Sequence, residues 1–133
     1  LAFVHVDAAR AVPRGGRGAL LSEHDGATQA HGLAVPGGQV SHTGVGGLTL
    51  GAGFGRVARR FGLSLDNVRS VEIVTGNGEI LRATAQENPE LYWGVRGGGG
   101  NFGVVTSFDF GLHPMQRQVL GAKITHRLRS DLT

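Results

Sequence analysis

The chain has 133 residues, the length of one domain, and 24 of them are glycine. Glycine is therefore about two and a half times as frequent as the usual ~7%. A hydrophobic content of 40% and a mean hydropathy of -0.03 argue against a disordered chain. The formal charge of +3 comes from the residues after Pro114, because nine arginines balance nine acids before that point. A basic surface for nucleic acid is therefore not expected.

The residue types also exclude several kinds of site. The chain has no cysteine, which removes disulfides, thiolate metal sites and cysteine nucleophiles. Its six histidines lack metal-ligand spacing, so we expect no metal. No apolar run reaches the ~18 to 20 residues of a membrane helix, and no membrane partner is expected. The chain begins at Leu1 in strand-like sequence, so we interpret it as a fragment, with a cytoplasmic location as the default expectation.

The first elements in chain order are a strand pair and a helix. Residues 3–6 and 11–12 predict strands joined by a turn, and the glycine-arginine run at 14–18 is expected to break the second strand. Residues 19–31 predict a helix that stops at Gly32. Its expected apolar face holds Leu20, Leu21, His24, Ala27 and Ala30.

A turn, a glycine-rich segment and a short helix follow. Pro36 begins the Pro-Gly-Gly turn, and residues 44–55 form a glycine-rich segment around a Leu-Thr-Leu insert. Residues 56–61 predict a short helix that stops at Gly62.

The second half predicts a hairpin, a helix and a strand. Residues 68–75 and 79–83 flank a Gly-Asn-Gly turn, which is typical of a β-hairpin. Asn88-Pro89 is typical of a helix start, and we expect Tyr92 and Trp93 on this helix to lie in the core. Residues 104–112 predict a strand with Phe108, Phe110 and Leu112 on one face.

The predicted elements indicate an α+β domain. Strands joined by hairpins, without regular strand-helix-strand alternation, favour a mixed or antiparallel sheet with flanking helices. His113-Pro114 is interpreted as a boundary, which divides the chain into 1–114 and 115–133.

Glycine is concentrated in two stretches. Nine glycines lie between residues 32 and 55, and six lie between 94 and 103. Such clusters indicate places where the backbone adopts positive φ or approaches something closely. Backbone N–H groups of glycine-rich turns near a helix start suit phosphate, so a dinucleotide is one candidate ligand. Tight turns and close strand contacts are the alternative.

The second cluster matches the spacing of a nicotinamide dinucleotide fingerprint. Gly98, Gly100 and Gly103 follow the pattern GxGxxG. That fingerprint requires a strand before the glycines, a helix after them and an acid about 20 residues further on. Here a predicted helix precedes, a predicted strand follows, and no carboxylate lies near residue 120. We therefore do not expect such a site, and the chain also lacks the Gly-Lys-Ser/Thr of a phosphate-binding P-loop.

Three motifs in order carry a family resemblance. They are the segment from Gly32 to Gly55, the Gly-Leu-Ser-Leu-Asp-Asn of residues 62–67, and the segment from Asn88 to Thr106. Together they resemble the FAD-linked oxidases of the vanillyl-alcohol-oxidase type, and most closely the bacterial berberine-bridge-enzyme-like branch. The resemblance runs from about Val4 to Pro114. It implies a PCMH-type FAD-binding domain of two α+β subdomains with FAD between them, of which residues 1–114 would be the C-terminal part. Residues 115–133 would then begin a substrate-binding domain.

The resemblance also implies which residues contact FAD. In this family, the stretch that matches residues 41–55 lines the flavin diphosphate and runs beside the isoalloxazine ring. The expected cofactor-binding residues are Ser41, Thr43, Gly44, Gly46, Gly47, Thr49, Gly53, Gly55, Asn67 and Val105. Among them Gly53 and Gly55 are close-approach glycines, and the backbone of Val105 meets the adenosine end.

The chain departs from the family pattern at several points. Family members often attach FAD to an upstream histidine, and nothing before Phe3 supplies one; a cysteine used by some members is absent. Leu48 stands where plant members carry histidine, and Ala52 replaces a common glycine, a change that matters only if φ is positive there. His42 is interpreted as a structural loop residue. The catalytic residues remain unassigned, because the family's substrate base usually comes from outside this segment.

The resemblance implies an FAD-dependent oxidoreductase. Its small-molecule substrate would give a hydride from an alcohol, amine or sugar carbon to the flavin, and oxygen is the expected electron acceptor. Without the first subdomain we expect the fragment to bind FAD weakly or not at all. The alternative is a degenerate flavin-fold module with a binding or structural role. Nucleic-acid binding through the basic tail is disfavoured, because its cations lack aromatic partners.

Overall fold

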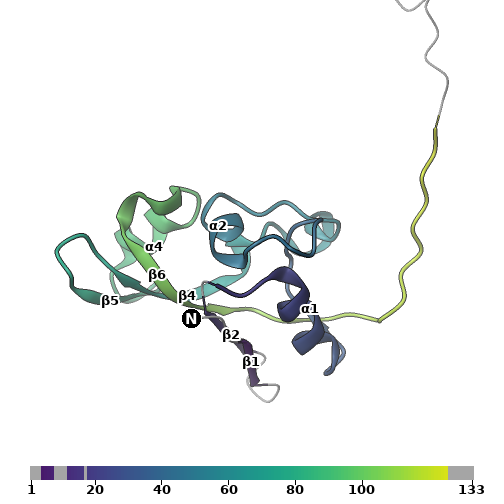
Figure 1. Ribbon diagram of the computed structural model, residues 1–133, viewed down its shortest axis with the longest axis horizontal. Helices are drawn as coiled ribbons and strands as arrows, with labels where there is room; N and C mark the ends of the chain where they lie inside the picture. The colour runs from purple at the N-terminus through teal and green to yellow at the C-terminus, as the bar shows by residue number, and fades with distance from the viewer. Residues whose placement is uncertain (1–3, 8–11, 17, 126–133) are drawn as a thin grey trace, which may run out of the picture.

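The computed structural model describes residues 4–7, 12–16 and 18–125. Its five-stranded sheet has the order β1-β2-β6-β4-β5, and every neighbouring pair is antiparallel. The strands are β1 (Val4–Asp7), β2 (Val12–Gly16), β4 (Val68–Val74), β5 (Ile80–Ala83) and β6 (Val104–Phe110). The helices are α1 (Leu21–Gln29), α2 (Val45–Leu50), α3 (Ala58–Phe61) and α4 (Pro89–Val95), with single 3-10 turns η1 (Leu65–Asn67) and η2 (Gly99–Phe102). The predicted α+β class is confirmed (Figure 1).

The first strand pair forms as expected, but its second strand is longer. β1 pairs with β2, and the predicted turn between them lies outside the described residues. The expectation that residues 14–18 break the strand is wrong, because Arg14 to Gly16 pair with β6. This pairing uses backbone N–H and C=O groups. A neighbouring strand can therefore hold glycine residues in an extended conformation that their local propensity alone would not favour.

Helix α1 is shorter than expected, and the predicted apolar face is right at Leu21 and His24 but not at its ends. It begins at Leu21, since Leu20 is an extended capping residue whose N–H donates to Glu23 at 2.7 Å. The buried side chains are Leu21, His24 and Thr28, whereas Leu20 and Ala30 are exposed. The face predicted through Leu20 and Ala30 is therefore wrong at both ends, because those residues lie outside the helix.

The middle of the chain contains two elements that the sequence did not predict. Helix α2 lies inside the glycine-rich segment 44–55. A two-stranded ribbon joins β3 (Leu33–Ala34) to β7 (His113–Pro114), which are far apart in the sequence. The proposed boundary dipeptide thus belongs to a strand of the folded body.

The remaining elements match their predictions, with one exception. Helix α3, the β4–β5 hairpin, helix α4 and strand β6 all lie where they were expected. Tyr92 is half-buried and its hydroxyl donates to the Val68 carbonyl at 2.6 Å, but Trp93 is 76% exposed. The core placement of Trp93 is wrong, because α4 turns Leu91, Tyr92 and Val95 inward and leaves Trp93 on its outer side.

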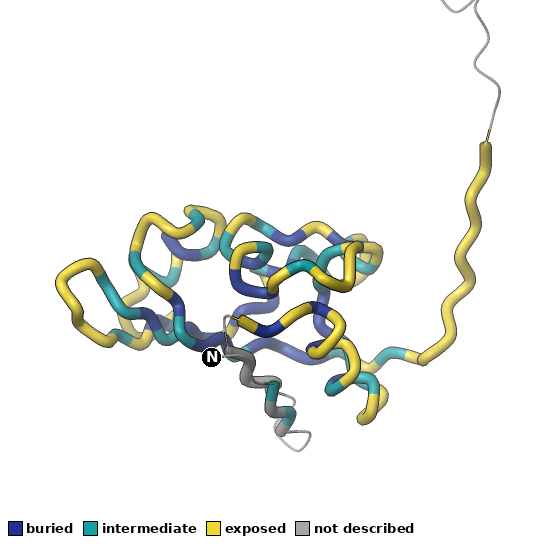
Figure 2. The backbone as a smooth tube through the Cα atoms, in the orientation of Figure 1, coloured by how far each residue is buried: buried dark blue, intermediate teal, exposed yellow. Residues whose placement is uncertain are grey.

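The sheet has one apolar and one polar side. Phe108 and Phe110 are fully buried, and their rings stack at 5.6 Å between centroids. His24 of α1 packs edge-on against Phe110, so that helix lies over the apolar side. Figure 2 shows the buried positions concentrated in the sheet and in the segments packed on it. After Met115, residues 116–125 are exposed and run away from the body (Figure 1).

Candidate functional site

A cleft of about 340 Å³ lies where the two glycine clusters meet. Its walls come from α2 on one side and from η2 and the start of β6 on the other. The Gly97 N–H donates to the Leu50 carbonyl at 3.1 Å, which joins the loop after α4 to the end of α2. The cleft is lined by Gly46, Gly47, Leu50, Gly100, Gly103, Val104, Val105 and Phe108.

Several glycines around this cleft are not explained by the fold of the chain itself. A Cβ added at Gly44, Gly47 or Gly100 would meet no atom within 4 Å, and none of these residues has positive φ. By contrast, Gly103 has a φ of +138° and its Cβ would lie 2.3 Å from the Val74 carbonyl oxygen. The glycines at 47 and 100 therefore keep space open in the cleft wall.

Backbone groups supply the polarity of the cleft. None of the described residues that line it carries a charge. Gly46 and Gly47 lie in the first turn of α2, where N–H groups have no intrahelical acceptor. The Val45 N–H in the same turn donates to the Ala19 carbonyl at 2.9 Å. Free peptide donors beside an apolar floor fit part of a flavin nucleotide, and the volume is at the small end for a ligand site.

Three of the expected cofactor residues line the cleft and three lie just before it. Gly46, Gly47 and Val105 are in its wall. Gly44 caps α2, while Ser41 and Thr43 lie in the preceding turn. The Ser41 and Thr43 carbonyls accept hydrogen bonds from the first turn of α1 at 2.9 and 3.0 Å. These contacts fix the entry to α2 against α1.

Three other expected residues are packed inside the protein. The Thr49 hydroxyl is buried and lies 2.9 Å from the Ser64 hydroxyl. A Cβ on Gly53 would approach Ser64 Cβ to 2.3 Å, and one on Gly55 would approach the Gly37 carbonyl oxygen to 1.8 Å. The close approaches at these glycines are therefore made to the chain's own atoms.

The Asn67 side chain is engaged entirely within the protein. Its amide group donates to the Phe61 and Leu63 carbonyls at 3.0 and 2.7 Å. Its oxygen is 2.5 Å from Nε2 of His113, which must donate because the amide oxygen can only accept. Asn67 joins α3 to β7 and does not line the cleft. Its role toward FAD stays a prediction.

Ala52 replaces a glycine that is common in the family, and its backbone φ is positive. Its φ is +122°, a region that side-chain-bearing residues rarely adopt. The Leu65 N–H donates to the Ala52 carbonyl at 3.0 Å, and the Ser64 N–H donates to the Gly53 carbonyl at 2.9 Å. These hydrogen bonds hold the strained backbone in place.

Sequence reasoning missed part of the cleft. Gly100 and Gly103 belong to the second glycine cluster, which was expected to face the same cofactor, but neither was named among the expected cofactor-binding residues. The sequence shows only an apolar pattern at Leu50, Val104 and Phe108. Such a pattern does not distinguish the floor of a cleft from a closed core.

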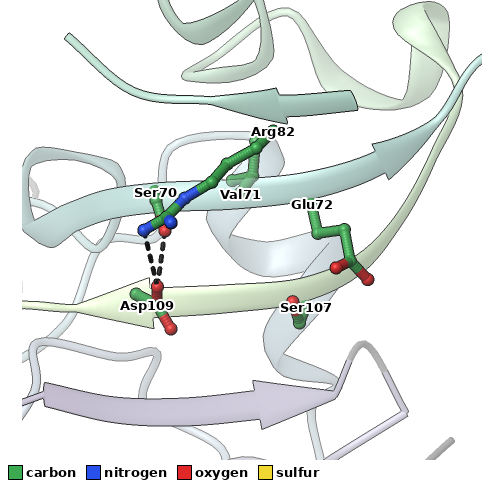
Figure 3. A pocket seen from close by; sticks show the side chains of 6 residues that line it. All are labelled: Ser70, Val71, Glu72, Arg82, Ser107 and Asp109. Atoms are coloured by element: carbon green, nitrogen blue, oxygen red, sulfur yellow. Dashed lines mark hydrogen bonds and ion pairs between the residues drawn. The ribbon is translucent and has the colours of Figure 1, made fainter. Parts of the chain in front are cut away.

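A second, polar hollow of about 210 Å³ lies on the other side of the sheet. Figure 3 shows Ser70 and Arg82 both reaching Asp109: the Ser70 hydroxyl donates to that carboxylate at 2.5 Å and Arg82 lies 3.8 Å from it. Thr106 donates to the Glu72 carboxylate at 2.6 Å. Arg82 and Asp109 form an ion pair and Glu72 accepts a hydrogen bond from Thr106, and we assign this hollow no ligand.

The described residues offer no other centre for chemistry. Within them no group of three or more metal-ligating side chains comes together. His42 is exposed and does not line the cleft. His24 is buried with no hydrogen-bond partner for Nε2, and burial lowers its pKa from 6.5 to about 4. No helix in the described ranges is long and apolar enough to span a membrane.

The sequence matches known proteins over most of its length. The profile of the family described as FAD binding domain matches residues 3–84. An FAD-linked oxidoreductase from Dictyostelium discoideum is 48% identical over 104 residues, which is 78% of this chain and 23% of that protein.

Solved structures show the same likeness. The 6-hydroxy-D-nicotine oxidase from Arthrobacter nicotinovorans superposes with a TM-score of 0.83 and 34% identity, covering 85% of this chain and 25% of that one. The BBE-like 1 protein from Physcomitrella patens gives a TM-score of 0.79 and 33% identity, covering 84% of this chain and 25% of that one. The chain thus spans about a quarter of the length of these relatives.

Proposed function

The chain belongs to the FAD-binding domains of the vanillyl-alcohol-oxidase (PCMH-type) oxidoreductases, with FAD as cofactor, and we propose that its glycine-lined cleft is one wall of the FAD site. The observation that carries this proposal is the open space at Gly47 and Gly100, where the chain's own packing gives no reason for glycine. The parent protein is then an FAD-dependent oxidase of a small molecule.

The chain's own residues hold and shield the cofactor in this proposal. The N–H groups of Gly46 and Gly47 are donors to an electron-rich part of FAD. Val105, Phe108 and Leu50 form an apolar floor that excludes water from one side. When bound, FAD supplies the acceptor for a hydride from an alcohol, amine or sugar carbon and passes the electrons to oxygen.

The domain division and the branch are part of the same proposal. Residues 1–114 form the C-terminal part of the FAD-binding domain, and residues 115–133 begin the substrate-binding domain. Support comes from the exposure of residues 116–125. The bacterial berberine-bridge-enzyme-like branch is proposed on the likeness to the nicotine oxidase from Arthrobacter nicotinovorans.

The proposal is tested by filling the cleft without harming the fold. In Gly47→Ala the new Cβ lies in space that the chain leaves open, and Gly47→Leu adds a larger side chain at the same point. Both changes raise helix propensity by up to about 1 kcal/mol. We expect equal or greater stability together with weaker FAD binding. The matched controls are Gly26→Ala and Gly26→Leu, since Gly26 lies in α1 with nothing within 4 Å and outside the cleft.

The readout is flavin fluorescence during titration of the purified 133-residue chain with FAD. We expect a dissociation constant above about 10 µM for the chain alone, because one wall of the site supplies only part of the contacts to FAD. Micromolar or tighter binding would contradict the fragment interpretation. Equal FAD affinity in Gly47→Leu and Gly26→Leu would place the cofactor elsewhere.

A further inference from the structure

An arginine stands at the start of the second glycine cluster, and the chain itself holds its side chain. Arg96 follows α4 directly, and it is not among the residues that line the glycine-lined cleft. Its guanidinium lies over the Tyr92 ring, 4.8 Å from the ring centroid. Nη2 of the same group lies 3.9 Å from Oδ1 of Asp66, and 28% of the side chain is exposed. Stacking and an ion pair fix the orientation of the planar guanidinium.

The Arg96 side chain also completes a ring of three hydrogen bonds, which we call the Leu65 ring. The Arg96 Nε–H donates to the Leu65 carbonyl at 3.0 Å. The Leu65 N–H donates to the Ala52 carbonyl at 3.0 Å, and the Gly97 N–H donates to the Leu50 carbonyl at 3.1 Å. The ring closes because Leu50 is near Ala52 along the chain and Arg96 is next to Gly97. It connects the end of α2, the turn η1 and the loop after α4.

The Leu65 ring joins the two walls of the cleft. Leu50 belongs both to the ring and to the α2 wall. Gly100, three residues after Gly97, belongs to the opposite wall. A Cβ on Gly97 would lie 3.7 Å from Cδ2 of Leu65, so the loop after α4 packs on η1 at this point. The separation of the two walls therefore depends on how the ring is closed.

Arg96 supplies the one side chain in this ring, because the other donors and acceptors are backbone groups. The Leu65 carbonyl also accepts a hydrogen bond from the Val68 N–H. Loss of the guanidinium therefore leaves that carbonyl with a partner, and the cost of an unsatisfied buried acceptor is avoided. What is lost is the link between η1 and the loop after α4.

We propose that Arg96 is a positioning residue of the FAD site, which sets the separation between α2 and the glycine-rich loop at 97–103. The inference rests on the proposed function of the cleft. Arg96 acts through Leu50 and Gly100, which line the cleft, and it makes no contact with the cofactor itself. Residues behind a site in this way keep its lining groups at the spacing that the ligand requires.

The first test compares the nitrogen-15 amide spectra of the 133-residue chain and its Arg96→Met variant without FAD. We expect clear shifts at Leu50 and Gly100, which lie on opposite walls and are not sequence neighbours of residue 96. Tyr92→Phe is the matched control. It removes the hydroxyl that donates to the Val68 carbonyl at 2.6 Å but keeps the aromatic ring under the guanidinium. We expect the Leu50 and Gly100 amides to stay in place in this control.

The second test titrates the same chains with FAD, at a temperature where circular dichroism shows each of them to be folded. We expect Arg96→Met to weaken FAD binding by about tenfold, the usual effect of losing a hydrogen bond from a charged group. Tyr92→Phe is expected to bind FAD as the unchanged chain does. Arg96→Lys keeps the charge but lacks the fixed Nε–H, so we expect an intermediate loss. It replaces Arg96→Met in both tests if that variant does not fold.

Three results would overturn the proposal. The first is unmoved Leu50 and Gly100 amides in Arg96→Met. The second is an equal loss of FAD affinity in Tyr92→Phe, since a general loosening of the fold would then explain both variants. The third is a loss in Arg96→Met that disappears at about 0.5 M salt, which would assign the guanidinium a direct electrostatic role toward the FAD phosphates.

Failure of the proposed function gives a different result. FAD would then shift amides centred outside the cleft in the unchanged chain. The spectra recorded without FAD do not depend on that outcome, and they decide whether Arg96 sets the position of the cleft walls.

Discussion

Replacement of Ala52 by glycine is expected to stabilise the protein. A residue with a side chain at a φ of +122° carries strain of about 1–3 kcal/mol. Glycine adopts this region freely, but its greater freedom in the unfolded chain costs about 0.4–1 kcal/mol. The difference predicts a gain of about 0.5–2 kcal/mol in the free energy of unfolding. With an unfolding entropy of about 2.1 cal/mol/K per residue, this is a rise of about 2–7 °C in Tm.

The assay is urea and thermal denaturation followed by circular dichroism at 222 nm. The matched control is Ala85→Gly, because Ala85 lies in an exposed loop without positive φ. It has no strain to release, so we expect it to lose about 0.4–1 kcal/mol. The two substitutions thus have opposite expected signs. The reasoning is refuted if Ala52→Gly is as destabilising as Ala85→Gly.

Three further changes test the packing. The free energy of unfolding, measured by urea titration, should fall by about 2 kcal/mol between pH 7 and pH 5. The reason is that His24 takes up a proton in the unfolded chain at its usual pKa of 6.5 but in the folded chain only near 4. His24→Leu should remove this loss. Thr49→Val should cost about 1–3 kcal/mol by leaving the Ser64 hydroxyl buried without a partner, whereas Thr49→Ser should cost less. Gly55→Ala should cost at least about 2 kcal/mol and Gly100→Ala almost nothing, judged from Tm.

Local sequence signals predicted the regular elements well. The Gly-Asn-Gly turn fixed the β4–β5 hairpin, and proline after Asn88 fixed the start of α4, because both signals act through nearby backbone geometry. Where distant segments decide the outcome, the predictions failed. The strand at Arg14 to Gly16 depends on β6, and the β3–β7 ribbon depends on a partner about 80 residues away.

The candidate site shows the same limit. Glycine clustering predicted two places of special backbone geometry, and the structure brings them together at one cleft. Clustering could not predict which glycines are required by close packing within the chain, such as Gly55, and which leave open space in the cleft wall, such as Gly47. That distinction depends on atoms contributed by other segments, and a single sequence does not contain their positions. The side of α4 that packs inward could not be predicted from the sequence either, as the exposed Trp93 shows.

The central claim, that the glycine-lined cleft is a wall of the FAD site, is tested most directly by nitrogen-15 NMR of the 133-residue chain titrated with FAD. Weak binding still moves amide resonances, so the map does not depend on a high affinity. The account predicts the largest shifts at Gly46, Gly47, Gly100 and Val105. Shifts centred outside the cleft, for example on Arg56, would contradict it.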